Sequence, residues 1–254
     1  MELKVTQVDS LAIQIYDSRD EMGKVAADNA IIYIKQLLKE KEEINILFAA
    51  APSQNEFLKY LIQKDIDWSK VNALHMDEYI GLPEDAPQRF GYYLNKHLFS
   101  LVNFKSVHYL YQNGTSAEEM CTRYENLLKK YPLDIVCMGI GENGHIAFND
   151  PHVAAFDDVL LVKTVSLDEK CRLQQVHDGC FPSLDEVPLQ AITVTIPVMM
   201  QAKKIFCIVP GNSKSNAILH TLTGEITSKC PASVLRMHKG ATLFCDKESA
   251  ASVL

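Results

Sequence analysis

One stretch of the chain places polar side chains that could do chemistry directly behind an apolar run. Residues 133–138 are mostly apolar, and three glycines with Gly-x-Gly-x-x-Gly spacing follow before His145. An apolar run that ends in glycines predicts a buried strand leading into a tight turn. Asn143 and Asp150 flank the histidine, and an amide or a carboxylate could fix its tautomer. We therefore expect these groups at the carboxyl end of a sheet, where open α/β sheets bind ligands.

Two other interpretations of this stretch stay open. The same glycine spacing occurs in dinucleotide-binding turns, but there a helix follows the last glycine. Here Asn149-Asp150-Pro151 interrupts the chain within a few residues, which disfavours nucleotide binding. A histidine beside a loop can also be purely structural, and its spacing alone does not decide between that role and catalysis.

Polar residues follow two further apolar runs. Residues 44–51 lead into Ser53 and Gln54, where Ser53 and Glu56 have capping-box spacing. A helix that starts there leaves free amides that could bind a phosphate, although a plain capped helix fits equally well. Residues 71–76 lead into Asp77 and the adjacent Glu78, which could start a helix, lie in a loop, or hold a general base at a strand end.

A lysine occupies an unfavourable position near the start of a later helix. Lys214 falls in the first turn of a helix that opens at Pro210 and runs to about Thr223. Its charge opposes the helix dipole, so an anion nearby would explain it. A surface lysine without function remains the alternative.

The elements that must position these residues alternate between strands and helices. We expect strands at residues 11–16, 44–51, 71–76, 107–111, 133–138, 159–165, 191–196, 205–209, 235–237 and 241–245, and helices at 18–41, from 53, 90–102, 116–130, 168–176 and 210–223. This alternation predicts an α/β fold with a single doubly wound, mostly parallel sheet and helices on both faces, Rossmann-like, over residues 1–254. Residues 152–188 are expected to form a small lid segment, irregular and mobile from 178 to 188.

Composition limits the classes of function. The 254 residues are 47% hydrophobic with a net charge of -7, which argues against a nucleic-acid binder. Seven cysteines without a Cys-x-x-Cys pair favour reduced thiols in a cytosolic protein. No signal peptide and no apolar run of membrane-spanning length is found, so we expect a cytoplasmic protein that binds no membrane.

Two segments together resemble the glucosamine-6-phosphate deaminase (isomerase) family. They are Met76–Pro83 and Gly139–Pro151, and the likeness continues through Val187–Val194 and Gly211–Lys214, covering most of the chain. The related 6-phosphogluconolactonases share the Gly-x-Gly-x-x-Gly-His core but usually lack the Phe-Asn-acid-Pro continuation. The resemblance implies an enzyme of carbohydrate metabolism that acts on an amino-sugar phosphate without metal or organic cofactor. It leaves open an assembly of identical chains.

The resemblance also implies roles for individual residues. Asp77 would be the base that moves a proton from C2 to C1 of the opened sugar, and His145 the group that opens the ring. Asn143 and Asp150 would orient the histidine. The groups expected to bind the substrate phosphate are Ser53, Gln54 and Lys214.

The chain departs from the family pattern around the same pocket. Family members usually have Asp where this chain has Asn143, so the partner of the histidine lacks a charge. They usually have Glu where it has Asp150, and a Thr-Gly-Gly-Thr loop where it has residues 50–53. A lid arginine is missing: His177 and Asp178 fall near its place, with Arg172 the nearest alternative.

These departures keep three functions in view. The first is an isomerase and deaminase that converts glucosamine 6-phosphate, or a close relative, to fructose 6-phosphate and ammonia. The second is a lactone hydrolase of the 6-phosphogluconolactonase type, with His145 activating water. The third is a catalytically weakened sensor that binds sugar phosphates, an alternative that the Asn143 departure leaves open.

Overall fold

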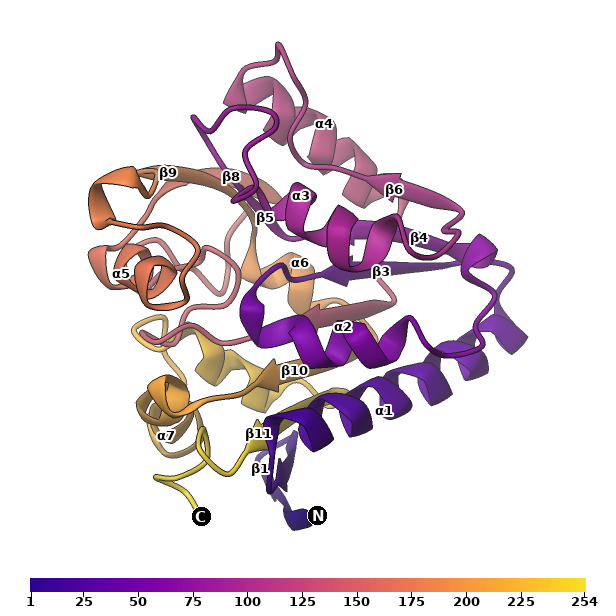
Figure 1. Ribbon diagram of the computed structural model, residues 1–254, viewed down its shortest axis with the longest axis vertical. Helices are drawn as coiled ribbons and strands as arrows, with labels where there is room; N and C mark the ends of the chain where they lie inside the picture. Colours follow the sequence, from indigo (N-terminus) through magenta and orange to yellow (C-terminus); the bar gives the residue numbers. More distant parts are fainter.

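The computed structural model describes residues 1–254, and its centre is an eight-stranded sheet (Figure 1). In spatial order the strands are β1 (Glu2–Val8), β2 (Leu11–Tyr16), β11 (Ala241–Asp246), β10 (Lys204–Val209), β7 (Ile135–Met138), β3 (Ile44–Phe48), β4 (Val71–His75) and β6 (Ser106–His108). All neighbours pair in parallel except β1 and β2, which form an antiparallel hairpin at one edge. The mostly parallel sheet that the sequence predicts is confirmed.

Helices cover both faces of this sheet. One face carries α1 (Arg19–Glu40), α2 (Asn55–Leu61) and α3 (Phe90–Leu94), and the other carries α4 (Ala117–Lys130), α6 (Ile196–Met200) and α7 (Ser215–Thr223). Strand residues alternate between the two resulting cores: Ile135 and Cys137 of β7 belong to one, Val136 and Met138 to the other. This period of two is why β7 is apolar on every residue.

Shorter elements complete the chain. They are the 3-10 turns η1 (Pro52–Gln54), η2 (Trp68–Lys70), η4 (Leu184–Glu186), η5 (Asn212–Lys214) and η6 (Pro231–Met237), the π turn η3 (Asn95–Phe99), and helix α5 (Glu169–His177). The strand expected at residues 235–237 is wrong, because these residues end η6. Strand β1 and helix α6 were not expected. None of the helices combines the length and the apolar composition that crossing a membrane requires.

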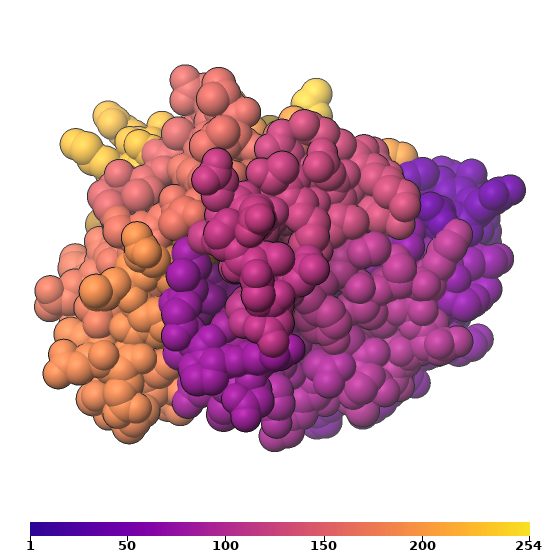
Figure 2. Space-filling view, turned by 90° about the horizontal axis from the view of Figure 1, so that it is seen from above, coloured from indigo at the N-terminus to yellow at the C-terminus, as the bar shows by residue number.

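A second, three-stranded sheet lies beside the first. Its strands β5 (Asp77–Tyr79), β9 (Gln190–Val194) and β8 (Val162–Ser166) pair antiparallel. Figure 2 shows the purple chain near residue 80 against the orange chain near residue 190. Asp77 therefore begins a short strand opposite Thr193, which fixes its backbone more firmly than a loop would.

The order of the strands reverses between β3 and β7. From β3 the chain continues to β4 and β6 on one side, whereas β7 is followed by β10 and β11 on the other side. The loops after β3 and β7 therefore diverge and leave a crevice at the carboxyl ends of the strands. Open α/β sheets bind their ligands at such a switch point.

The segment expected to act as a lid contains regular structure. Residues 152–188 hold β8, α5 and η4, with irregular chain between them. Arg172 donates hydrogen bonds to the carbonyls of Leu184 (2.6 Å) and Val187 (3.0 Å), which ties α5 to the turn that follows it. That the segment moves as a lid stays a prediction.

Candidate active site

A pocket opens at the carboxyl ends of β3, β4, β7 and β10. Its lining includes seven polar or charged side chains: Ser53, Gln54, Asp77, His145, Gln174, Gln175 and Lys214. Of the seven residues proposed from the sequence, five are in this lining, and the other two, Asn143 and Asp150, contact His145. Segments more than a hundred residues apart in the chain thus meet at one place.

The ring of His145 is held through its Nδ1 atom. Nδ1 lies 2.8 Å from Oδ1 of Asn143 and 3.0 Å from Oδ1 of Asp150. Both neighbours are hydrogen-bond acceptors, so the arrangement assigns a proton to Nδ1 and leaves the lone pair of the neutral ring on Nε2. A histidine in this tautomer can take a proton from a ligand in the pocket.

Asp150 supplies the negative charge that Asn143 lacks. Its carboxylate is completely buried, accepts from Nδ2 of Asn143 (2.9 Å) and from the backbone amide of Asp168 (3.0 Å), and lies beside the histidine. Burial opposes its ionisation, but the hydrogen bonds and charge of His145 and the other donors outweigh burial and lower the pKa of Asp150. His145 therefore has a negatively charged partner in Asp150, although Asn143 is uncharged.

Two glycines in the turn make room for this arrangement. A Cβ atom at Gly141 would lie 2.1 Å from Cε1 of His145, so any side chain there would displace the ring. Gly144 has a φ of +84°, a conformation that L side chains rarely adopt. Gly141 is thus needed for close approach and Gly144 for its backbone angle.

Asp77 places a second carboxyl group in the pocket. The residue is 7% exposed, and burial, followed by the charge of Glu78, raises the pKa of Asp77 well above its ordinary value. Glu78 is held apart from it by backbone amides of Phe90 (3.1 Å) and Gly91 (3.0 Å) at the start of α3. A buried carboxyl with a raised pKa is suited to exchange protons with a ligand.

Three further polar groups of the lining, Ser53, Gln54 and Lys214, form what we call the anion end of the pocket. Nε2 of Gln54 donates to Oγ of Ser53 (3.1 Å) and to the carbonyl of Ile208 (3.2 Å), while its Oε1 has no partner. Lys214 is 4% exposed and its Nζ also lacks a partner. Burial lowers the pKa of Lys214, and an anion beside it would compensate for the lost hydration.

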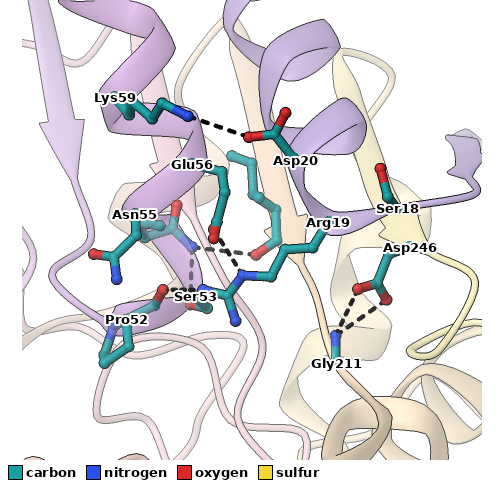
Figure 3. Close-up of polar contacts among 12 residues, drawn as sticks. Ser18, Arg19, Asp20, Pro52, Ser53, Asn55, Glu56, Lys59, Gly211 and Asp246 are labelled. Carbon is teal, nitrogen blue, oxygen red and sulfur yellow. Dashed lines mark hydrogen bonds and ion pairs between the residues drawn. The ribbon is translucent and has the colours of Figure 1, made fainter.

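A polar network behind η1 supports the anion end (Figure 3). Nε of Arg19 lies 2.7 Å from Oε2 of Glu56, and the guanidinium also donates to the carbonyl of Pro52. The capping box expected between Ser53 and Glu56 is wrong, because Glu56 pairs with Arg19 and Ser53 makes no capping bond. Nothing in the spacing of Arg19 points to a contact 37 residues away.

The chain is similar to known proteins over most of its length. The family described as "Glucosamine-6-phosphate isomerases/6-phosphogluconolactonase" matches residues 17–244. The chain belongs to this family. Among curated relatives, glucosamine-6-phosphate deaminase of Streptococcus sanguinis is 34% identical over 92% of this chain and 95% of its own length. The enzyme of that name from Clostridium acetobutylicum is 35% identical over 91% and 95%.

Solved structures of the family share the fold. A structure described as a monomeric glucosamine-6-phosphate deaminase has a TM-score of 0.84 and 29% identity, covering 94% of this chain and 99% of its own. A 6-phosphogluconolactonase from Thermotoga maritima has a TM-score of 0.76 at 20% identity, covering 93% and 100%, which shows likeness of fold alone. The Rossmann-like α/β class is therefore confirmed.

Helix α5 contributes uncharged side chains to the pocket and no arginine. Gln174 and Gln175 of α5 line the pocket, whereas Arg172 bonds to carbonyls of the following turn. Sequence reasoning did not select these glutamines, because two adjacent amides in a helix carry no recognisable pattern. Gln174 and Gln175 reach the pocket only because α5 packs beside it, and this packing is not evident from the local sequence.

A cluster of possible metal ligands surrounds the histidine, but it does not fit a metal ion. Nδ1 of His145, a carboxylate oxygen of Asp150 and Sγ of Cys171 lie within 4.8 Å of one another. The Nδ1 atom already shares its proton with two oxygens. Burial, followed by the charge of Asp150, raises the pKa of Cys171 well above its ordinary value, so the thiol keeps its proton.

Proposed function

We propose that this chain is an amino-sugar-phosphate isomerase and deaminase that converts glucosamine 6-phosphate and water to fructose 6-phosphate and ammonia. One observation carries the proposal: His145, Asp77 and an unpartnered Lys214 share one pocket. Relatives that match over most of their length bear the name glucosamine-6-phosphate deaminase. The chemistry needs a proton shuttle, a carboxylate base and an anion site, and the pocket holds one group suited to each.

Ring opening is assigned to His145. Its Nε2 takes the proton of the anomeric hydroxyl and returns a proton to the ring oxygen, which breaks the C1–O5 bond. Asp150 stabilises the imidazolium that forms in between, because its carboxylate lies 3.0 Å from Nδ1. Asn143 fixes the ring orientation from the other acceptor position.

Isomerisation is assigned to Asp77. Its carboxylate removes the proton from C2 of the open-chain aldose and delivers it to C1, while one proton of the C2 amine is transferred to the carbonyl oxygen O1. The aldehyde carbon thereby becomes CH2OH and the C2 amine becomes an imine. Water then adds to C2, the C–N bond breaks, and ammonia leaves with the proton balance unchanged. The raised pKa of Asp77 makes the group a stronger base than an exposed carboxylate once it has ionised.

The phosphate is assigned to the anion end. Lys214 supplies the charge and the hydroxyl of Ser53 donates a hydrogen bond, while Gln54, whose amide hydrogens bond to Ser53 and to the carbonyl of Ile208, holds that hydroxyl in place. Arg19 supports the same turn through the carbonyl of Pro52. We further propose that residues 1–254 act as one domain and that residues 152–188 close over the bound sugar. Closure would exclude water from the proton transfers.

Purified protein with glucosamine 6-phosphate tests the assignment. The expected result is stoichiometric release of ammonia and fructose 6-phosphate, each followed by a coupled enzyme assay. Folded protein that is stabilised thermally by the sugar phosphate but forms no product would identify a sensor and overturn the proposal. Faster consumption of 6-phosphogluconolactone than of glucosamine 6-phosphate would overturn it in favour of a lactone hydrolase.

A further inference from the structure

We propose that His75 is a positioning residue that holds the base Asp77 within reach of the sugar. The inference rests on the proposed function, because it gives a second residue a part in the proton transfer assigned to Asp77. The two residues belong to different sheets: His75 ends β4 in the large sheet, and Asp77 begins β5 in the small one. Only Met76 lies between them, so the place of Asp77 depends on how this junction is held.

The carboxylate of Asp77 is held in place only through its own backbone. No group of the protein donates a hydrogen bond to it, and its pKa is shifted by burial and by the charge of Glu78. The backbone belongs to a strand at the edge of its sheet, which pairs with β9 alone and places Asp77 opposite Thr193. Further support for the base therefore has to come from outside this strand pair.

The ring of His75 makes two hydrogen bonds that together define its tautomer. Nε2 lies 2.9 Å from the backbone nitrogen of Leu110, which can only donate, so Nε2 carries no proton. The proton of the neutral ring is then on Nδ1, which lies 3.0 Å from the carbonyl oxygen of Asp77, a group that can only accept. The ring thus ties the backbone of the base to the loop that follows β6.

The surroundings of the ring keep it neutral and in place. His75 is 1% exposed, and burial lowers its pKa to about 4. The rings of Tyr109 and Tyr124 pack edge-on against it, with centroids 6.2 Å and 6.3 Å away. Protonation of Nε2 would remove the acceptor that the amide of Leu110 uses, and burial prevents this at neutral pH.

A small displacement of Asp77 is sufficient to slow the reaction. The carboxylate has to lie within hydrogen-bond distance of the proton on C2, and a misplacement of about 1 Å can cost roughly 10²-fold in rate. The groups assigned to ring opening and to the phosphate, His145 and Lys214, follow other strands, β7 and β10. Loss of the bond from His75 to Asp77 should therefore lower kcat and leave KM nearly unchanged.

Two substitutions of His75 separate its two hydrogen bonds. The side-chain amide of asparagine lies where Nδ1 lies in histidine, so His75→Asn keeps the donor to Asp77 and loses the acceptor for Leu110. The longer glutamine places its amide near Nε2, so His75→Gln keeps the acceptor and loses the donor. Both variants lose the ring packing and should melt earlier by similar amounts. We expect kcat for ammonia release to fall by about 10–10²-fold in His75→Gln and by less than about threefold in His75→Asn.

Tyr124→Phe is the control for lost stability at the same junction. The hydroxyl of Tyr124 accepts from the backbone amide of His75 (2.9 Å) and donates to its carbonyl (2.7 Å), but makes no hydrogen bond to Asp77. The variant should melt earlier and keep its kcat within about threefold of that of the unaltered chain. Equal losses of kcat in all three variants, or a loss that appears in KM alone, would overturn the positioning role.

A measurement on the unaltered chain covers the case in which a His75 variant does not fold. Nitrogen-15 spectra of histidine-labelled protein should show one ring that is protonated at Nδ1 and coupled through Nε2 to the amide of Leu110, unchanged between about pH 5.5 and 8.5. A ring protonated at Nε2, or one that titrates in this range, would overturn the inference. Absence of ammonia release from the unaltered chain would overturn the proposed function instead and leave these spectra measurable.

Discussion

The histidine end of the pocket has its polar groups hydrogen-bonded, whereas the anion end leaves two buried groups without partners. His145, Asn143 and Asp150 satisfy one another through three short contacts. Nζ of Lys214 and Oε1 of Gln54 have no hydrogen-bond partner. The difference indicates that the groups proposed for proton transfer are already held in place, while the end proposed to bind the anion has polar atoms free to contact a ligand. Each prediction below alters one side of this contrast.

Asp77→Asn should have the largest effect on activity. Loss of the base should lower kcat for ammonia release by about 10²–10⁴-fold. Because burial raises the pKa of Asp77, the unfolded chain ionises first, and stability is lost as pH rises from 3.8 towards the folded pKa. Asparagine removes that cost, so the melting temperature at neutral pH should rise by roughly 2–4 °C per kcal/mol gained.

The control for Asp77 is Asp65→Asn, which changes a fully exposed carboxylate. Both its activity and its melting temperature should match those of the unaltered chain. An Asp77→Asn protein that melts earlier than the control would show that the carboxylate stabilises the fold and would contradict the pKa argument.

Asp150→Asn should cost both activity and stability. The variant removes the only carboxylate beside Nδ1 of His145, and we expect kcat to fall by about 10²-fold. The lowered pKa of Asp150 means that its stabilisation is present above pH 3.8 and is lost as pH falls further. At neutral pH the variant should be less stable by about 1–3 kcal/mol, measured by urea unfolding. Asp157→Asn changes an exposed residue of the segment 152–188 and should lower neither kcat nor stability.

Lys214→Met tests the anion end, with a smaller effect. A hydrogen-bonded charge contributes about 1.5–3 kcal/mol, so kcat/KM should fall by roughly 10–100-fold, mainly through KM. The unliganded variant should melt no earlier than the unaltered chain, because it loses a buried charge without a partner. Thermal stabilisation by glucosamine 6-phosphate should disappear, and the exposed change Lys229→Met should leave it intact. A drop in unliganded stability would mean that the lysine has a structural partner.

Most of the residues proposed to act on the substrate were predicted from the sequence, whereas most of the residues that hold them in place were not. Apolar runs that end in polar residues placed Asp77, His145 and Lys214 at one sheet edge, because parallel strands share a direction. The three-residue strand β5 was beyond prediction, since its pairing partner β9 lies more than a hundred residues further along the chain. Arg19 and Gln174 act through contacts that depend on helix docking, which local spacing does not encode.

Asn143→Asp should have the smallest effect, although it restores the usual family residue. Nδ2 of Asn143 donates to Asp150 at 2.9 Å, so an aspartate would put two buried carboxyl groups in contact. Such a pair shares a proton, and His145 would still face a single negative charge. We expect kcat to change by less than about threefold, while Asn143→Ala, which removes the second acceptor at Nδ1, should lower it further. A tenfold gain in Asn143→Asp would show instead that Asp150 does not provide the charge, and that the histidine end is incomplete in this chain.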